Sequence, residues 1–201
     1  MFERYTESAR RALFFARYEA SELSRTSIEP VHLLLGVLRA RKGATGKLFA
    51  LWHISYEDVR PKVDAGRGEK LPTSTEIPFS TESKRVLDYT AQESDRLGHS
   101  YIGTEHLLLG LLREERSMAF RILSGYDMRL DRVRDQLTQL LNAPLEPPLQ
   151  GEDGFTTGTF DRLDRIERIR HLIDRLAHAA PGSAEARDAI DRIRQALDTL
   201  S

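Results

Sequence analysis

The sequence predicts an all-α protein in which one helical repeat is used twice and is followed by a C-terminal helical hairpin. Shifted by 74 residues, the 201-residue chain matches itself without a gap, and residues 28–39 lie over residues 102–113 with eight of twelve positions identical. Apolar residues recur at intervals of three and four, the period of an amphipathic helix. A match at constant offset indicates an internal duplication, and we expect its two buried helices to pack around a pseudo-twofold axis.

The first helix of each copy begins at a hydroxyl residue, Thr6 or Ser80. A Ser or Thr side chain at this position accepts hydrogen bonds from free N–H groups of the first turn, and the following Glu7 and Glu82 favour the positive end of the helix dipole. Small or apolar residues at positions 9, 13, 16, 20 and 23 form one face of the first copy's helix. The second copy carries a more polar stripe at the matching positions.

The second helix of each copy reads His-Leu-Leu-Leu-Gly-x-Leu-Arg and is apolar nearly all round. Such a helix is expected to be the buried centre of its repeat. Gly36 and Gly110 each lower helix propensity by about 1 kcal/mol, which indicates close approach by another helix. We expect His32 and His106, which occupy the same position in the two blocks, to be buried and to hydrogen-bond a backbone carbonyl.

Two shorter helices complete each copy, near residues 44–51 and 55–65 in the first and near 118–124 and 128–141 in the second. Pro61 falls inside the first copy's last helix, where the second copy has Asp135, and predicts a kink or a late start there. The double repeat is therefore predicted to span residues 1–141, with repeat one at 1–65, a connecting loop at 66–78 and repeat two at 79–141.

The C-terminal part begins with a linker at residues 142–158, which contains three prolines. Residues 159–201 carry two apolar stripes separated by the Pro-Gly-Ser turn at 181–183, and this pattern predicts a helical hairpin. A hairpin with two narrow apolar seams is too small to be a stable domain alone. It must therefore pack on the repeats, on a second chain as a homodimer, or on a partner.

Composition argues against several classes of protein. The 30 Lys and Arg residues stand against 31 Asp and Glu residues, whereas a nucleic-acid binder usually shows a basic excess. No run of about 18 apolar residues and no signal segment is present, so we expect no membrane partner. The absence of Cys rules out disulfides and thiolate metal sites. A cytoplasmic protein is the expectation.

Motifs for catalysis are missing as well. The nearest approach to a P-loop, Gly-Ala-Thr-Gly-Lys-Leu at residues 43–48, has the wrong glycine spacing and lacks the hydroxyl that binds magnesium. There is no Gly-x-Ser-x-Gly elbow and no His-Glu-x-x-His zinc motif. His99, Glu105 and His106 could in principle join in a metal site, but structural roles for them are favoured. We expect no enzymatic activity, no cofactor and no metal.

Residues 98–114 read Gly-His-Ser-Tyr-Ile-Gly-Thr-Glu-His-Leu-Leu-Leu-Gly-Leu-Leu-Arg-Glu and closely resemble the Clp N-terminal repeat. The opening Met-Phe-Glu-Arg-Tyr-Thr-Glu is similar to the start of such chains. This repeat occurs as a tandem pair at the head of Clp-type unfoldases, the ClpC class in particular. The resemblance spans roughly residues 1–141 and implies a compact helical domain that serves protein quality control, here without an ATPase module.

The resemblance also implies a ligand site. Domains of this family dock adaptor proteins, and some Gram-positive members hold substrates tagged with phosphoarginine. In such a pocket a carboxylate pairs with the guanidinium in a fork, while hydroxyl and basic groups take the phosphate. Matching by position makes Glu105 the acid, and the hydroxyl and basic positions are Thr6, Arg10, Ser80 and Lys84. In the first repeat Val31 and Pro30 replace the acid and the threonine, so at most one of two pockets is complete.

Hypotheses from three classes follow. The leading one is a stand-alone binding module, similar to a Clp N-domain, that recognises adaptors, tagged substrates or small cyclic ligands of a Clp protease/unfoldase system, as a client presenter or as a competitor. The alternative is a structural or regulatory helical protein with a degenerate ligand site, in which Glu105 only stabilises a helix dipole and the C-terminal hairpin is the working surface. A hydrolase rests on nothing beyond the presence of Ser, His and Asp.

Overall fold

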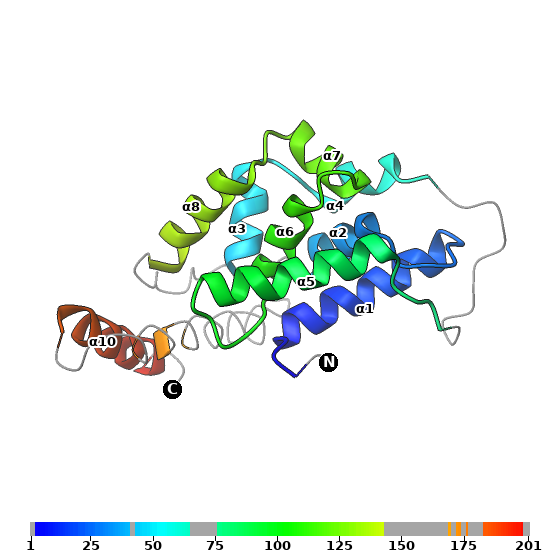
Figure 1. The fold of residues 1–201 in the computed structure, drawn as a ribbon. Coiled ribbons are helices and arrows are strands. Elements are labelled where there is room, and N and C mark those ends of the chain that lie inside the picture. The colour runs from blue at the N-terminus through cyan, green and yellow to red at the C-terminus, as the bar shows by residue number, and fades with distance from the viewer. Residues whose placement is uncertain are drawn as a thin grey trace, which may run out of the picture.

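The structure is a computed structural model that describes residues 3–40, 43–64, 76–142 and 183–198, with the single positions 169, 172, 173 and 176. Repeat one contains α1 (Glu7–Glu22), α2 (Pro30–Arg39), α3 (Gly43–Leu51), α4 (Tyr56–Val59) and the 3-10 helix η1 (Arg60–Lys62). Repeat two contains α5 (Thr81–Arg96), α6 (Thr104–Arg113), α7 (Met118–Gly125) and α8 (Leu130–Asn142). Over these described ranges the fold is all-α, as predicted, and the first two helices of each repeat keep the offset of 74 residues (Figure 1).

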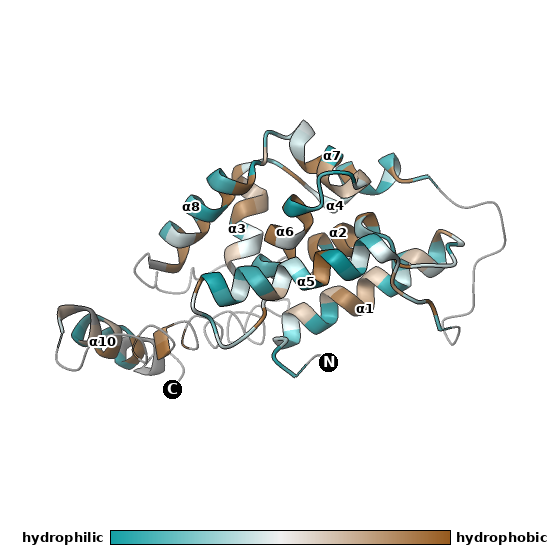
Figure 2. Cartoon of the chain, viewed as in Figure 1, coloured by the Kyte–Doolittle hydropathy of each residue, from teal (hydrophilic) through white to brown (hydrophobic). Residues whose placement is uncertain are grey.

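Helices α2 and α6 form the centre of the molecule. Every residue from 30 to 38 in α2 and from 104 to 112 in α6 is buried, which confirms the prediction for the His-Leu-Leu-Leu blocks. Helix α1 packs mainly on α2 and helix α5 mainly on α6, while α2 and α6 also contact each other. Figure 2 shows hydrophobic residues along the central helix α2 and many hydrophilic residues along α5 and α8.

The two repeats are interlocked. Helix α3 of repeat one packs on α8 and α6, and helix α7 of repeat two packs on α2. Two isolated parallel bridges, Tyr5 with Ile102 and Ile28 with Phe79, also join the repeats. Because each repeat covers part of the other's central helix, the double repeat is one hydrophobic core rather than two.

The predicted helix caps are present. The Thr6 hydroxyl accepts from the N–H of Ala9 at 3.2 Å, and the Ser80 hydroxyl accepts from the N–H of Ser83 at 3.1 Å. Each satisfies one N–H group that has no partner within its helix. The first helix of each copy therefore begins where the hydroxyl residue predicts.

The predicted close approach at the two glycines is also confirmed. A Cβ on Gly36 would collide with the backbone of Ala12 in α1, and a Cβ on Gly110 would collide with the backbone of Val86 and the side chain of Thr90 in α5. The central helices can therefore touch the backbones of α1 and α5 only because these positions have no side chain.

The prediction of a kink or late start at Pro61 was wrong. Helix α4 begins at Tyr56, the position that matches the start of α8, but ends after one turn and continues as the 3-10 turn Arg60–Lys62. Proline lacks the backbone N–H that an α-helix requires, and its ring clashes with the carbonyl four residues earlier. With Asp135 in place of the proline, α8 continues to Asn142.

Each repeat contains a buried carboxylate held by two arginines, which the sequence patterns did not predict. Glu19 is 1% exposed and accepts from Arg39 and Arg60, both at 2.8 Å. At the same offset, Glu93 is 1% exposed and accepts from Arg113 at 3.1 Å and from Arg134 at 2.7 Å. The hydrogen bond to Glu93 raises the pKa of Arg134. These networks tie the first, second and last helix of each repeat together.

The C-terminal segment is described only in part. Helix α10 (Ala184–Asp198) forms the second arm of the predicted hairpin, and the Ser183 hydroxyl accepts from the N–H of Ala186 at 3.1 Å. The predicted linker at 142–158 and the first arm lie almost wholly outside the described residues. Among the helices that the structure describes, none combines the length and apolar character needed to span a bilayer.

Candidate functional site

The starts of four helices meet in two junctions that are related by the repeat. At the first, the N–H of Thr6 donates to the Ile102 carbonyl at 2.9 Å, which places the start of α1 beside the start of α6. At the second, the N–H of Ser80 donates to the Ile28 carbonyl at 3.0 Å, which places the start of α5 beside the start of α2. Each junction is therefore built from both repeats, and we call them the Glu105 junction and the Val31 junction.

The five predicted site residues divide between these junctions instead of forming one pocket. Thr6 and Arg10 lie on α1 at the Glu105 junction, whereas Ser80 and Lys84 lie on α5 at the Val31 junction. Arg4, just before α1, binds Ser94 and Asp95 in the last turn of α5 at 3.1 and 2.7 Å. Because α5 has 16 residues, its first turn lies roughly 24 Å from its last.

The junctions differ at the position of the predicted acid. Glu105 is 4% exposed, and both of its carboxylate oxygens lie against Gly103, where a Cβ would collide with them. The matching residue of the Val31 junction is an apolar side chain buried in the core. In the partner helices the basic residues Arg10 and Lys84 are both exposed. Among the described residues, the Glu105 junction thus combines an acid at this matched position with a hydroxyl and an exposed cation, whereas the acid of the Val31 junction is Glu29 at the helix cap.

The two repeat histidines cap the central helices. His106 Nδ1 accepts from the N–H of Gly103 at 2.9 Å, and His32 Nδ1 accepts from the N–H of Glu29 at 2.9 Å. Both histidines are buried, as predicted, but the prediction of a backbone carbonyl partner was wrong. The reason is position: at the third residue of a helix, the nearest unpaired backbone group is an N–H of the first turn, which requires an acceptor.

Burial and the helix cap determine the protonation state and the tautomer of His32. Burial lowers the pKa of His32 to about 4, and the charges of Arg25 and Arg60 add to this effect. With Nδ1 accepting from Glu29, the proton of the neutral ring lies on Nε2, which has no hydrogen-bond partner within the described part of the chain. His32 is therefore a neutral structural residue at neutral pH.

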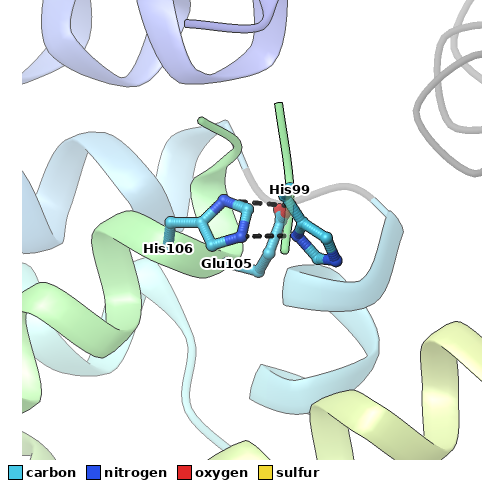
Figure 3. Close-up of side chains that lie close together, drawn as sticks. All are labelled: His99, Glu105 and His106. Carbon is cyan, nitrogen blue, oxygen red and sulfur yellow. Dashed lines mark hydrogen bonds and ion pairs between the residues drawn. The ribbon is translucent and has the colours of Figure 1, made fainter. Parts of the chain in front are cut away.

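In repeat two the corresponding ring belongs to a cluster. His106 Nε2 lies 2.8 Å from His99 Nδ1, and His106 Nδ1 lies 3.5 Å from Glu105 Oε1 (Figure 3). The ring of Tyr101 stacks on His99 with centroids 5.0 Å apart. One ligand atom from each of His99, Glu105 and His106 can be chosen so that all lie within 4.8 Å of one another. The sequence favours structural roles for these three residues, with a metal site as a possibility, and the turn that precedes α6 brings them together.

A groove in each repeat was not predicted either. In repeat two a space of about 570 Å³ is lined by Tyr89, Leu112, Arg113, Glu115, Phe120, Ser124, Met128, Arg129 and Leu130. In repeat one a space of similar volume lies at the matching positions 46, 50, 54 and 55. The Arg113 guanidinium lies 4.3 Å from the Tyr89 ring centroid at the edge of the first groove. The repeat-two groove is lined by apolar and charged residues, whereas the repeat-one groove is lined by apolar and uncharged polar residues and His53.

Comparison with known sequences shows what the chain is similar to. The profile described as the Clp repeat (R) N-terminal domain matches residues 4–126 and 78–162. The Bacillus subtilis (strain 168) protein named negative regulator of genetic competence ClpC/MecB is 37% identical over 145 residues, 71% of this chain and 18% of that protein. The chloroplastic chaperone protein ClpC1 of Oryza sativa subsp. japonica is 32% identical over 201 residues, 98% of this chain and 22% of that protein. The chain thus spans about a fifth of the length of these relatives.

Solved structures show the same architecture. The N-terminal domain of the caseinolytic protease associated chaperone ClpD from Arabidopsis thaliana superposes with a TM-score of 0.51 at 26% identity, covering 71% of this chain and 97% of that domain. The Hsp104 N-terminal domain from Candida albicans superposes with a TM-score of 0.57 at 21% identity. The match covers 70% of this chain and 93% of that domain. The second likeness concerns the fold alone.

Proposed function

The chain belongs to the Clp N-terminal repeat family, and on this basis we propose that it is a binding module for adaptors or tagged substrates of a Clp protease/unfoldase system. Clp N-domains of this family are non-catalytic modules that bind substrates and adaptors. We extend this to the present chain and assign it binding rather than catalysis.

The observation that carries the proposal is the composition of the Glu105 junction. The acid comes from α6 of repeat two, and the hydroxyl of Thr6 and the cation of Arg10 come from α1 of repeat one. A carboxylate accepts two N–H groups of a guanidinium in a fork, and Arg10 is placed to neutralise a phosphate. The ligand that fits this set is a phosphorylated arginine side chain on a protein or peptide.

Binding requires the acid to turn outward. In this structure the Glu105 carboxylate is folded against Gly103 and is nearly inaccessible. The Thr6 hydroxyl already accepts from Ala9, so it contributes to the ligand as a donor. A ligand guanidinium therefore competes with the groups that hold Glu105 inward, and it gains the fork only after the carboxylate has rotated.

We propose one such junction in the chain, because the Val31 junction has valine where the other has Glu105. A protein with two tag-binding sites gains avidity when both sites bind at once, and a chain with one site does not. We therefore propose that it holds clients weakly, either presenting them to an unfoldase or competing for them. A homodimer formed through the C-terminal hairpin would restore two sites per particle.

The alternative, a structural or regulatory protein that acts through its C-terminal hairpin, predicts no ligand at the Glu105 junction. We propose a cytoplasmic location, with no nucleic-acid or membrane partner. Relatives include bacterial and chloroplastic proteins, and the location is therefore tested by fractionation of the native cell.

Titration calorimetry with an arginine-phosphorylated peptide and its unphosphorylated twin tests the proposal. We expect one binding event per chain with the phosphorylated peptide, and at least tenfold weaker binding of the twin. No heat with either peptide, together with capture of partners by the full chain but not by residues 1–141, would favour the alternative function.

A further inference from the structure

The cluster of His99, Glu105 and His106 presents two imidazoles and one carboxylate to a common point beside the start of α6 (Figure 3). We propose that this cluster binds a divalent transition-metal ion of the zinc class. The proposal stands on the separation and chemistry of these three side chains and does not depend on whether the chain binds a tagged peptide.

The donor set and the distances suit zinc. Imidazole nitrogen and carboxylate oxygen ligate Zn²⁺ at about 2.0–2.2 Å, so two ligand atoms in a tetrahedral site lie about 3.3 Å apart. His99 Nδ1 and His106 Nε2 are 2.8 Å apart, and the longest separation within the three-atom set is at most 4.8 Å. Small rotations of the rings and of the Glu105 side chain bring all three to ligating distance. Three protein ligands leave one position for water or an anion.

The protons can be accommodated without a net change in charge on the protein. In the metal-free structure His106 Nδ1 accepts from Gly103, so the neutral ring carries its proton on Nε2 and donates it to His99 Nδ1. When the metal takes the place of this shared proton, His106 becomes the Nδ1–H tautomer. Its Nδ1–H then faces the N–H of Gly103, which has to turn to another acceptor when the metal binds.

The backbone cap also has a substitute acceptor. Both carboxylate oxygens of Glu105 lie against Gly103, whose lack of a Cβ allows this approach. The N–H of Gly103 can therefore pass from His106 Nδ1 to the second oxygen of Glu105. One oxygen ligates the metal while the other keeps the start of α6 capped.

Burial favours retention of a bound ion. His106 is fully buried and His99 and Glu105 are each 4% exposed. A divalent cation at this point offsets the cost of holding the Glu105 carboxylate away from water. Because the three groups are nearly inaccessible, we expect uptake and release of the metal to be slow.

Repeat one provides an internal comparison. The residues that match His99, Glu105 and His106 are Arg25, Val31 and His32. His32 caps α2 in the same way as His106 caps α6, so the cap needs only the histidine. His99 and Glu105 are therefore not needed for the helix cap. In repeat one, the positive charge of Arg25 opposes a cation at the matching place. The site is therefore expected once per chain.

Glu105 belongs to this site and to the Glu105 junction. A bound metal ion and a ligand guanidinium therefore compete for the same carboxylate. We expect zinc to weaken the binding of an arginine-phosphorylated peptide, while zinc binding itself is measured in the absence of any peptide. Failure of peptide binding and failure of metal binding are thus separate outcomes.

The test uses the full chain after removal of metals with EDTA and dialysis. Titration with Co²⁺ is expected to show one equivalent with the visible absorption of a tetrahedral ion, and Zn²⁺ in competition with a chromophoric chelator is expected to show the same stoichiometry. His99→Arg, which introduces the residue of repeat one, should weaken binding by more than the roughly 10–100-fold that loss of an outer-shell partner causes. The double variant Arg25→His/Val31→Glu should bind a second equivalent.

Two results would overturn the proposal: no bound metal in the wild-type chain, or unchanged affinity in His99→Arg. Circular dichroism of the metal-free chains shows whether each variant folds. If His99→Arg does not fold, the double variant decides, since a second equivalent supports the site and the absence of one in a folded chain contradicts it.

Discussion

Gly36 in α2 lies directly against the backbone of Ala12 in α1, with no space for a Cβ between them. The contact is between main chains, so no side-chain rotation can relieve an added methyl group. We expect Gly36→Ala to lower the free energy of unfolding by about 2 kcal/mol through overpacking, in spite of a gain in helix propensity of about 1 kcal/mol. Urea denaturation measures the difference.

Gly125 is the matched control for this substitution. It ends helix α7 and has open space where a Cβ would be added. Gly125→Ala should leave stability within about 0.5 kcal/mol of wild type. Equal effects of the two substitutions would mean that α1 and α2 are further apart than the structure places them.

The buried Glu93 network should be important for stability. Glu93→Ala removes the shared acceptor of Arg113 and Arg134 and leaves two guanidinium groups partly buried without it. Breaking such a buried pair typically costs about 3 kcal/mol. Thermal unfolding should show a lower midpoint, and Asp131→Asn, which alters the same Arg134 at a carboxylate that is 93% exposed, should change the midpoint little.

His32 should make stability depend on pH. Its pKa in the folded chain is about 4, below the ordinary value of 6.5, so the unfolded chain binds more protons between these values. The contribution of neutral His32 is therefore complete above pH 6.5 and is lost as the pH falls toward 4, with a total on the order of 3 kcal/mol. Glu29, Arg25 and Arg60 face this ring, and the two arginines oppose its charging.

The variant His32→Gln isolates this effect, because glutamine keeps an acceptor at the third helix position without titrating. Chemical denaturation at pH values from 7 to 4 should show a shallower loss of stability in the variant than in wild type. Parallel curves would contradict the assignment of this pH dependence to His32.

The double repeat should fold without the C-terminal segment, because among the described residues its hydrophobic core contains none beyond Leu141. A fragment of residues 1–141 is expected to show one cooperative thermal transition by circular dichroism. A fragment of residues 1–65 should not fold, since α2 would lose its contacts with α6 and α7. A cooperative transition in the short fragment would show that the repeats are independent.

The ligand site makes a prediction that distinguishes the two junctions. Glu105→Gln should weaken binding of an arginine-phosphorylated peptide about tenfold or more, because a hydrogen bond to a charged group contributes about 1.5–3 kcal/mol. Val31→Glu should add a second binding event at the other junction. Calorimetric titration measures both, and equal affinity in wild type and Glu105→Gln would assign Glu105 to the helix end alone.

The basic residues test which side chains belong together. Arg10→Ala should weaken the binding event of the wild-type chain. Lys84→Ala should reduce only the second event that Val31→Glu creates, because Lys84 lies on α5 beside the start of α2. If Lys84→Ala instead weakened the binding event of the wild-type chain, the ligand would span the two junctions.

The sequence alone determined the features that depend on neighbouring residues. The offset of 74 residues, the buried character of α2 and α6, the caps at Thr6 and Ser80 and the close approach at Gly36 follow from period, capping chemistry and missing side chains. These features are local, so each helix carries its own signal. A kink or late start at Pro61 was predicted and an early helix end was found, since a proline that ends a helix and one that kinks it look alike in sequence.

The tertiary structure decided what depends on contacts between distant segments. Only the folded chain shows that Thr6 belongs with Glu105 and Ser80 with Val31, because the backbone bridges cross between repeats. The folded chain also brings Glu93 to Arg134, and it brings His106 to both Gly103 and His99. A duplicated sequence specifies two equal halves, but steric fit between the halves determines which end of each helix faces its partner.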